Sequence, residues 1–414
     1  MKRTRKIKRY NRIYRTGKHR VRPLQVVLIT IGCLALFFVG FSVIGPISDY
    51  LSGKIDPASS SSTLVSVLSS SSQEESSSEE SSGSGAVAVT ATHSAYLPAS
   101  AVRSTSSIDT LISQLQALDI NNVVLELKDE DGVIYYDSKV ETAVNAGVIS
   151  SNPIDLPAVI ERFTASGITV TAKLHAFQDD PGAKYLGALT GSSDAVVRYK
   201  GDTSYVWLDR AEYDGGKRWL NPYSDAAQKY ITDLSEELVS LGCTGVMLDS
   251  VQFPSGQALN MTDYGSKANT MTKQEALKGF ITSLQQDLGE QDAKLLVQVP
   301  AMAAIEEQAD QYGGSVLALG AQNLALTILP SELGRSITVG GQSISAPGQN
   351  PGEAVRAILA QIQTILGTTS STQLTAVIEG GSYSKEQVGA QITAAASAGL
   401  ESYLLYSEDG DYRF

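Results

Sequence analysis

The sequence predicts a (β/α)8 barrel, preceded by one transmembrane helix and a disordered, serine-rich linker. Short β-rich runs alternate with amphipathic helical stretches eight times over about 320 residues, which is typical of parallel βα units. Barrels of this kind have about 250 residues, so loop insertions account for the difference. No glycine-rich dinucleotide fingerprint follows the first strand, which leaves an open doubly wound sheet as the less favoured alternative.

The N-terminal region is set apart by its charge. Residues 1–22 contain 11 Lys and Arg residues and no acid, and residues 23–47 contain no charge at all. The uncharged stretch is long enough to span a bilayer, and it lacks the short apolar region of a signal peptide. The positive-inside rule then predicts a single-pass protein of the cell membrane, with a cytoplasmic N-terminus and an extracellular main domain. A buried core helix is the alternative interpretation of residues 23–47.

A linker and one large domain follow. Residues 59–84 include 15 Ser and four Glu among 26 residues, so we expect residues 48–88 to be disordered and to act as a stalk. Residues 89–414 have the composition of a globular domain. Beyond residue 22 the chain has 21 basic and 44 acidic residues, a net charge of −23, which argues against nucleic-acid binding.

The few Cys and His residues argue against disulfides and against a zinc site. Cys33 lies in the predicted membrane helix and Cys243 stands alone in the outer domain, so no disulfide is expected there. With only three His residues, a His-rich zinc site is not expected, and the sequence predicts neither a metal nor a cofactor.

The strands and helices follow in alternation. The eight predicted strands are 93–98, 121–129, 167–176, 244–250, 294–300, 323–330, 374–380 and 401–407. Apolar residues at spacings of three and four predict helices over 107–120, 224–242, 273–289, 351–367 and 384–399. The longest insertion, 177–222, follows the third strand and therefore lies on the face of a barrel where active sites form.

Acidic residues stand where strands end. Strands of a barrel direct their carboxyl ends toward one common bowl, and carboxylates flanked by aromatic rings are typical of a sugar site. The candidate catalytic residues are Asp249, Glu379, Glu126 and Asp129. The candidate substrate-binding residues are Lys128, His175, Trp207, Asp209, Trp219, Tyr223, Gln252, Phe253 and Gln298.

Four stretches carry a resemblance to a known family. Residues 95–138, 167–180, 207–242 and 245–254, the last reading "GVMLDSVQFP", are similar in order to motifs of the bacterial "putative glycoside hydrolase" domain family. The similarity is good from about residue 95 to 254 and weak beyond. It implies a (β/α)8 barrel of the α-amylase-like kind, in which the acid that ends the fourth strand, here Asp249, is the nucleophile.

The sequence departs from that family at supporting positions. Ser250 and Gln252 replace an aromatic residue and an Arg, and Met247 replaces the Arg of the amylase-like pattern. The fifth strand offers Gln298 where a proton donor is expected. A glycosidase of ordinary mechanism needs two carboxyl groups about 5–10 Å apart. The second one is therefore sought among the other three candidate acids.

Structural interpretations remain beside the catalytic ones. Asp249 could pair with Lys128 or Lys173 across the barrel, and Glu126 could form an ion pair inside it. We therefore expect a glycoside-hydrolase-like protein that acts on or binds a cell-wall or extracellular polysaccharide. A catalytically inactive carbohydrate-binding module and a structural envelope protein are the alternatives.

Overall fold

The computed structural model describes residues 91–414 except 368–369, 382 and 414. The predicted cytoplasmic tail, membrane helix and linker, 1–22, 23–47 and 48–88, lie outside these residues. Within the described part of the chain, none of the helices combines the length and apolar character that crossing a bilayer requires.

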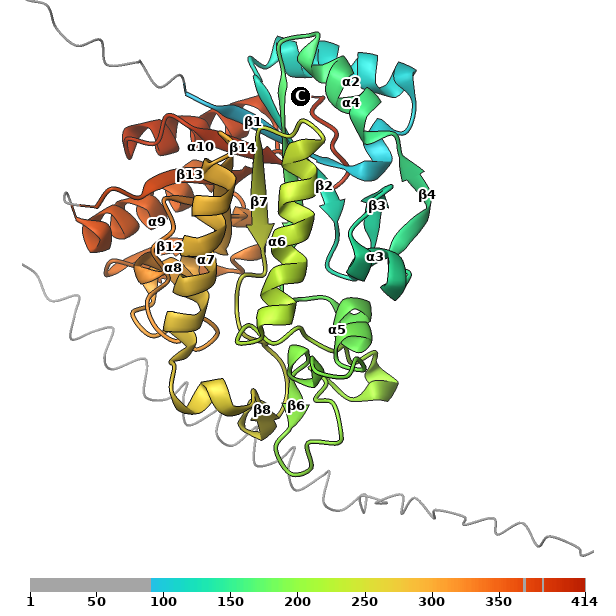
Figure 1. The fold of residues 1–414 in the computed structure, drawn as a ribbon. Coiled ribbons are helices and arrows are strands. Elements are labelled where there is room, and N and C mark those ends of the chain that lie inside the picture. Colours follow the sequence, from blue (N-terminus) through green and yellow to red (C-terminus); the bar gives the residue numbers. More distant parts are fainter. Residues whose placement is uncertain (1–90, 368–369, 382, 414) are drawn as a thin grey trace, which may run out of the picture. The chain divides into compact units, whose positions relative to one another are not determined.

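Eight parallel strands close into a barrel (Figure 1). Around the barrel they are β1 (His93–Pro98), β2 (Asn122–Lys128), β5 (Thr169–His175), β7 (Gly245–Asp249), β9 (Lys294–Pro300), β10 (Asn323–Ile328), β13 (Gln373–Glu379) and β14 (Tyr403–Tyr406). Because β1 pairs with both β2 and β14, the ring of strands has no open edge. All eight coincide with the predicted strands, so the barrel prediction is confirmed.

Helices cover the outside of the barrel. The longer ones are α2 (Thr105–Ala117), α4 (Leu156–Thr164), α6 (Asp225–Ser240), α7 (Lys273–Gly289), α9 (Pro351–Leu366) and α10 (Lys385–Ser397). Five of these confirm the predicted helices, and each buries its apolar stripe against the strands. Helices α6 and α7 pack side by side (Figure 1). Capping boxes fix the starts of α2, α7 and α10.

Several short elements were not predicted. After β2 the chain forms β3 (Ile134–Tyr136), α3 (Glu141–Ala146) and β4 (Ile149–Ile154), which extend the sheet beyond β2. The insertion after β5 contains α5 (Asp180–Leu186) and β6 (Arg198–Tyr199), and β6 pairs with β8 (Thr262–Asp263). A hairpin of β11 (Ser336–Val339) and β12 (Gln342–Ser345) precedes α9, and α8 (Ala301–Ile305) follows β9. These segments are too short to show a clear periodicity.

The barrel interior is divided into three layers. Its middle is a small apolar cluster, separate from the main core between strands and helices. Side chains point to the same face at every second residue of a strand, so the residues two places before and after this cluster also face inward. The middle layer consists of Tyr96, Val124, Met247, Ala325, Val377 and Leu404, with Leu296 and Tyr406 packed against it.

The two outer layers differ in chemistry. The layer nearer the C-terminal ends of the strands lies two positions after the middle layer in the sequence. It contains Glu126, Asp249, Gln298, Thr327, Glu379 and Tyr406. The layer nearer the N-terminal ends lies two positions before the middle layer. It contains Ser94, Asn122, Gly245, Lys294, Asn323, Thr375 and Ser402. We call the C-terminal opening the bowl and the N-terminal opening the mouth.

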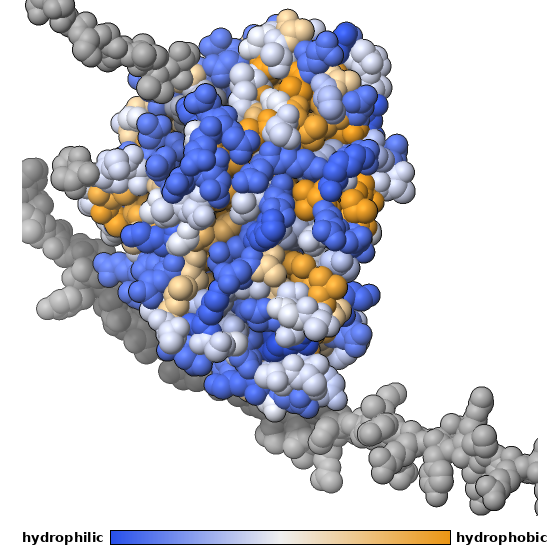
Figure 2. Space-filling model, viewed as in Figure 1, coloured by the Kyte–Doolittle hydropathy of each residue, from blue (hydrophilic) through white to orange (hydrophobic). Residues whose placement is uncertain are grey.

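The surface over α6 and α7 is mainly hydrophilic (Figure 2). On the same face, hydrophobic residues gather around α2 and α4 and around α3 and α5 (Figure 2). Val144 of α3 is about half exposed, at 51%. The polar surface of α6 and α7 agrees with two helices that bury one stripe each and expose the rest.

Candidate active site

Two carboxylates of the bowl share one ammonium group. The Lys173 Nζ atom lies 2.8 Å from Glu126 Oε1 and 3.8 Å from Asp249 Oδ2. The two carboxylate oxygens can therefore be no farther apart than the sum of these distances. That limit falls within the separation of about 5–10 Å that glycoside hydrolysis by two carboxyl groups needs. Of the candidate acids, Glu126 is thus brought into working distance of Asp249.

The shared cation explains how the site manages without an Arg at position 247. Lys173 of β5 pairs in register with Met247 of β7, so it stands at the same height on the neighbouring strand. Its ammonium group is almost buried and lies 5.6 Å above the ring of Tyr96. The positive charge that the amylase-like pattern supplies from the strand of the acid comes here from the adjacent strand. The expectation that Asp249 pairs with Lys173 is confirmed, and the pairing with Lys128 is not.

His175 links the cation to the turn that follows Asp249. Its Nε2 lies 3.0 Å from Lys173 Nζ, and its Nδ1 lies 3.1 Å from Ser250 Oγ. Burial and the charges of Lys173 and Lys128 lower the pKa of His175 to about 2, so the ring is neutral. An ammonium group can only donate, so Nε2 accepts and the ring proton lies on Nδ1, where it is donated to the Ser250 hydroxyl.

The turn after β7 holds the carboxylate of Asp249. Ser250 has φ 56°, a left-handed conformation that is uncommon for a residue other than Gly, Asn or Asp. In this conformation its N–H donates to Asp249 Oδ1 at 2.6 Å. Burial raises the pKa of Asp249, against the opposing effects of Lys173 and of this hydrogen bond. Strain of this kind in a turn next to a carboxylate is typical of functional sites.

Glu126 is held by two donors and faced by two aromatic rings. Its Oε2 accepts a hydrogen bond from Tyr96 at 2.9 Å, and its Oε1 accepts one from Lys173. Burial and the neighbouring Glu126 carboxylate raise the pKa of Tyr96, which therefore remains a donor. The ring of Tyr406 lies 4.9 Å from that of Tyr96. Tyr406 is partly exposed and supplies the accessible aromatic surface of the bowl, whereas Tyr96 is buried; neither residue was among the predicted site residues.

Lys128 turns away from the bowl. A β-bulge between Glu126 and Lys128 pairs Lys128 with Leu174, whose side chain belongs to the outer core. There the fully buried Lys128 lies 2.9 Å from Asp179 Oδ2 and donates to the carbonyl of His175 at 2.6 Å. The bulge thus places Lys128, which was predicted to contact substrate, on the outer side of the strand and away from the bowl.

Asp179 is enclosed by the backbone. Its Oδ1 accepts from the N–H of Gly182 at 2.7 Å, and burial raises its pKa against the effect of Lys128. A Cβ on Gly132 would lie only 2.4 Å from this carboxylate, and Gly132 also has φ 81°. Glycine is thus required at position 132 for two reasons, the lack of space for a Cβ and the positive φ.

The other candidate acids have structural partners. Asp129 Oδ1 accepts from the N–H groups of Asp131 and Val133 and so closes the turn before β3, which argues against its catalytic role. Glu379 faces the bowl from β13, where the Ser331 hydroxyl and N–H donate to it at 2.6 and 3.0 Å.

Three of the predicted substrate-binding residues with polar side chains lie in different places. Gln298 faces the bowl and donates to Thr327 Oγ1 at 3.0 Å, while its Oε1 is buried without a partner among the described residues. Gln252 accepts from the hydroxyl of Tyr312 at 2.9 Å. Asp209 is buried and accepts from the N–H of Lys217 at 2.9 Å, so it organises the long insertion rather than a binding surface.

The four aromatic candidates are core residues. Trp207, Trp219, Tyr223 and Phe253 are each at most 4% exposed. Tyr223 and Phe253 pack edge to face at 5.0 Å, which stabilises the insertion. These four rings, predicted as surfaces for a sugar ring, are covered by protein in the structure. Their side chains instead hold the loops beside the bowl.

Other reactive groups take no part in this site. Burial raises the pKa of the Cys243 thiol to about 12, so the thiol is not a nucleophile. In the part of the chain that the structure describes, no three His, Cys, Asp or Glu side chains form a group that could hold a metal ion.

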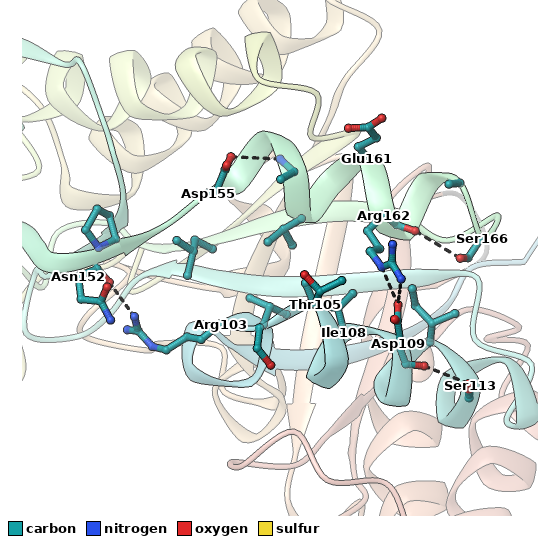
Figure 3. A pocket seen from close by; sticks show the side chains of 18 residues that line it. Arg103, Thr105, Ile108, Asp109, Ser113, Asn152, Asp155, Glu161, Arg162 and Ser166 are labelled. Carbon is teal, nitrogen blue, oxygen red and sulfur yellow. Dashed lines mark hydrogen bonds and ion pairs between the residues drawn. The ribbon is translucent and has the colours of Figure 1, made fainter.

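A separate cavity lies elsewhere on the surface. A cleft of about 900 Å³ runs between α2 and α4 (Figure 3). Arg162 bonds Asp109 across it, Arg103 donates to the carbonyl of Asn152, and Asp155 caps α4. Its charged groups thus serve neighbouring elements, and it has no pair of free carboxylates. The bowl is the better candidate for chemistry despite the size of this cleft.

Comparison with protein families identifies one match. Residues 94–412 match the model of a family described as "Putative glycosyl hydrolase domain". None of the curated proteins matches the sequence.

Comparison with solved structures finds similar chains at low sequence identity. An uncharacterized protein of Listeria monocytogenes EGD-e is similar with a TM-score of 0.50 and 14% identity, over 77% of this chain and 29% of that chain. The glycoside hydrolase domain of PelA from Pseudomonas aeruginosa has a TM-score of 0.39 and 14% identity, over 78% of this chain and 97% of that chain. A hypothetical protein of Ruminiclostridium thermocellum has a TM-score of 0.42 and 21% identity, over 49% and 96%. At these identities the likeness concerns the fold alone.

Proposed function

Because the chain belongs to the family described as "Putative glycosyl hydrolase domain", we propose that it hydrolyses glycosidic bonds of a polysaccharide. Glu126 and Asp249 act as the two carboxyl groups. The observation that carries this proposal is their common contact with Lys173, at 2.8 and 3.8 Å. Two carboxyl groups at such a separation are the minimum equipment of a glycosidase of ordinary mechanism.

The environments of the two acids support different roles. Burial raises the pKa of Asp249, which favours it as the proton donor to the leaving oxygen. Both oxygens of Glu126 accept hydrogen bonds, from Tyr96 and Lys173, which fixes it in the manner of a nucleophile or base. This assignment reverses the role of Asp249 that the family resemblance implies. The short separation of the two groups favours a retaining mechanism.

The neighbouring residues orient the pair. Lys173 keeps both carboxylates turned toward one point, and Ser250 fixes Asp249 through its backbone N–H. Tyr406, partly exposed beside Tyr96, offers an apolar face for a sugar ring. Glu379 faces the same bowl and supplies acceptor oxygens for sugar hydroxyl groups.

The substrate and location follow from the N-terminal sequence. We propose that residues 23–47 anchor the protein in the cell membrane and that the serine-rich linker carries the barrel outside the cell. The substrate is then a cell-wall or extracellular polysaccharide. An accessibility test supports or excludes this arrangement: protease added to intact cells should cleave the linker and release the barrel.

Hydrolysis is tested with the full-length chain. It is incubated with a panel of cell-wall and extracellular glycans, and released reducing ends are measured beside the E126Q and D249N variants. Release that depends on both acids supports the proposal, and the anomer of the first product, read by NMR, tests retention. A panel without any release, or release by both variants at the parental rate, contradicts it.

One observation favours a second function. The fifth strand provides the amide of Gln298 rather than an acid, and this is what a barrel that binds glycan without cleaving it would have. In that case a glycan pull-down retains the protein and no reducing ends appear.

A further inference from the structure

The mouth of the barrel contains a second cavity. It has a volume of about 320 Å³ and is lined by side chains or backbone at the start of all eight barrel strands. This volume is at the lower end of the range of about 300–1,000 Å³ that ligand sites occupy. The cavity thus has room for a molecule the size of a monosaccharide.

Its walls are neutral and polar. Ten of its lining residues carry a hydroxyl or an amide, whereas Lys294 and Asp292 are its only charged residues. Hydroxyl and amide groups can both donate and accept, so a ring of them matches a ligand that also has many hydroxyl groups. An ion would find few groups of opposite charge, and an apolar ligand would leave the wall groups without partners.

Part of this wall is fixed before any ligand arrives. Asn122 Nδ2 donates to Ser94 Oγ at 3.0 Å, and Asn122 Oδ1 accepts from Thr169 at 2.8 Å and Thr171 at 3.2 Å. Four side chains from three neighbouring strands are therefore held in one arrangement. A rigid strand scaffold with fixed polar groups lowers the entropy lost on binding.

The inner end of the cavity is apolar. Val124, Met247 and Leu404 of the middle layer form it, and each is at most 2% exposed. Gly245 lines the same wall, where the neighbouring strand comes so close that a Cβ would lie 2.8 Å from the carbonyl oxygen of Lys294. An apolar floor under a polar ring suits the C–H face of a sugar. The same layer separates the mouth from Glu126 and Asp249.

We propose that the mouth is a binding site for a small neutral polyol, of monosaccharide size, distinct from the bowl. The ligand lies with its apolar face on Val124 and Met247 and with its hydroxyl groups on the Ser94–Asn122–Thr171 network. Because the apolar layer lies between, this site does not depend on the hydrolytic role of the bowl.

The test follows the methyl group of Met247 in the full-length chain, labelled with ¹³C in its five methionine methyl groups. Glucose and myo-inositol are added up to about 100 mM, where a small ligand with a millimolar Kd saturates. We expect both to shift the Met247 signal, in the parental protein and in the D249N variant, and the charged sugar acid gluconate to leave it unchanged. No shift with glucose or inositol, or a shift that D249N abolishes, overturns the proposal.

A pair of variants locates the ligand. Thr375→Phe fills the cavity and should weaken glucose binding by about 10-fold or more, whereas the control Thr375→Ser should stay within about 2-fold. Equal affinity in T375F overturns the site. A glucose-soaked crystal of the parental protein gives a second readout that needs no variant: sugar density against Val124 and Met247 supports the proposal, and water alone there overturns it.

Discussion

The bowl and the mouth are built by the same eight strands, two residues to either side of one apolar layer, yet they differ in charge. In the bowl, Glu126, Lys173 and Asp249 bring three ionisable groups within 4 Å contacts. In the mouth, Asn122, Ser94 and Thr171 satisfy each other without charge. One apolar layer thus serves both ends of the barrel, and the two ends carry different polar groups.

Charge at one end is costly, and its cost is visible in the structure. Asp249 has a raised pKa and Ser250 a left-handed backbone, both of which reduce stability. The hydrogen-bonded network of the mouth shows neither feature, although Asp292 at the edge of the mouth also has a left-handed backbone, with φ 57°. If the bowl is the catalytic end, substitutions there should affect turnover more than stability. Conservative substitutions at the mouth should change neither turnover nor stability.

Removal of a bowl carboxylate should give the largest effect. E126Q and D249N are each expected to lower kcat/KM by about 10³-fold or more, because either loss removes one of the two acid–base or nucleophilic roles. T375S at the mouth is the matched control and should keep parental activity. Thermal unfolding checks that the variants fold. Parental kcat/KM in either carboxylate variant would remove the distinction between the two ends.

The buried pair behind the bowl should have the next largest effect, on stability. D179N leaves the fully buried Lys128 charge without its partner and should lower the free energy of unfolding by about 3–5 kcal/mol. The double variant K128M/D179L removes both charges and should recover most of that loss. Urea denaturation measures both. A D179N protein as stable as the parent would mean that the charges beside the bowl carry no such cost.

The shared cation should decide the roles of the two acids. Lys173 lowers the pKa of Asp249, so K173M should raise it further and reduce kcat by about 10²-fold, while K173R should retain most activity. A general acid loses activity when it is deprotonated. If Asp249 is the donor, the basic limb of the pH–rate profile moves to higher pH in K173M. A basic limb that stays in place would exclude Asp249 as the donor.

The buried histidine should give the smallest effect. Its pKa is about 2 in the folded protein and near 6.5 when unfolded, so the unfolded chain binds the extra proton between these values. Stability from this group is therefore present above pH 6.5 and is lost as the pH falls, by about 1 kcal/mol at pH 5.5. H175Q should flatten the difference in unfolding free energy between pH 7 and 5.5. An unchanged slope would show that His175 does not contribute.

Much of the fold could be predicted because its signals are local. Each barrel strand is a short apolar run between turn residues, and five helices show apolar spacings of three and four. The segments β3, β4 and α3 have no more than six residues each, so periodicity could not distinguish them. Parallel alternation then left few ways to close the sheet.

The candidate site was predicted only in part because side-chain direction depends on packing. Asp249 and Glu126 stand two residues after interior positions, and the rule of alternation was sufficient to find them. The aromatic residues of the insertion could not be assigned, since Trp207 and Trp219 have the same composition signal whether they face a ligand or the core. Tyr96 and Tyr406 lie within ordinary-looking strands, and only the closed ring brings β1 and β14 together.

The β-bulge in β2 shows how an insertion can redistribute charge. Glu126 and Lys128 would both face inward in a regular strand, and one extra residue sends the lysine to the outer core. The pairing register of the strand, as well as its sequence, therefore determines which charges face the bowl. Deleting Leu127 would remove the bulge but would leave the lysine directly after Glu126, opposite Leu174 and still outside the barrel. Only regular pairing of the intact strand, with Lys128 opposite His175, would bring a second ammonium group into the interior.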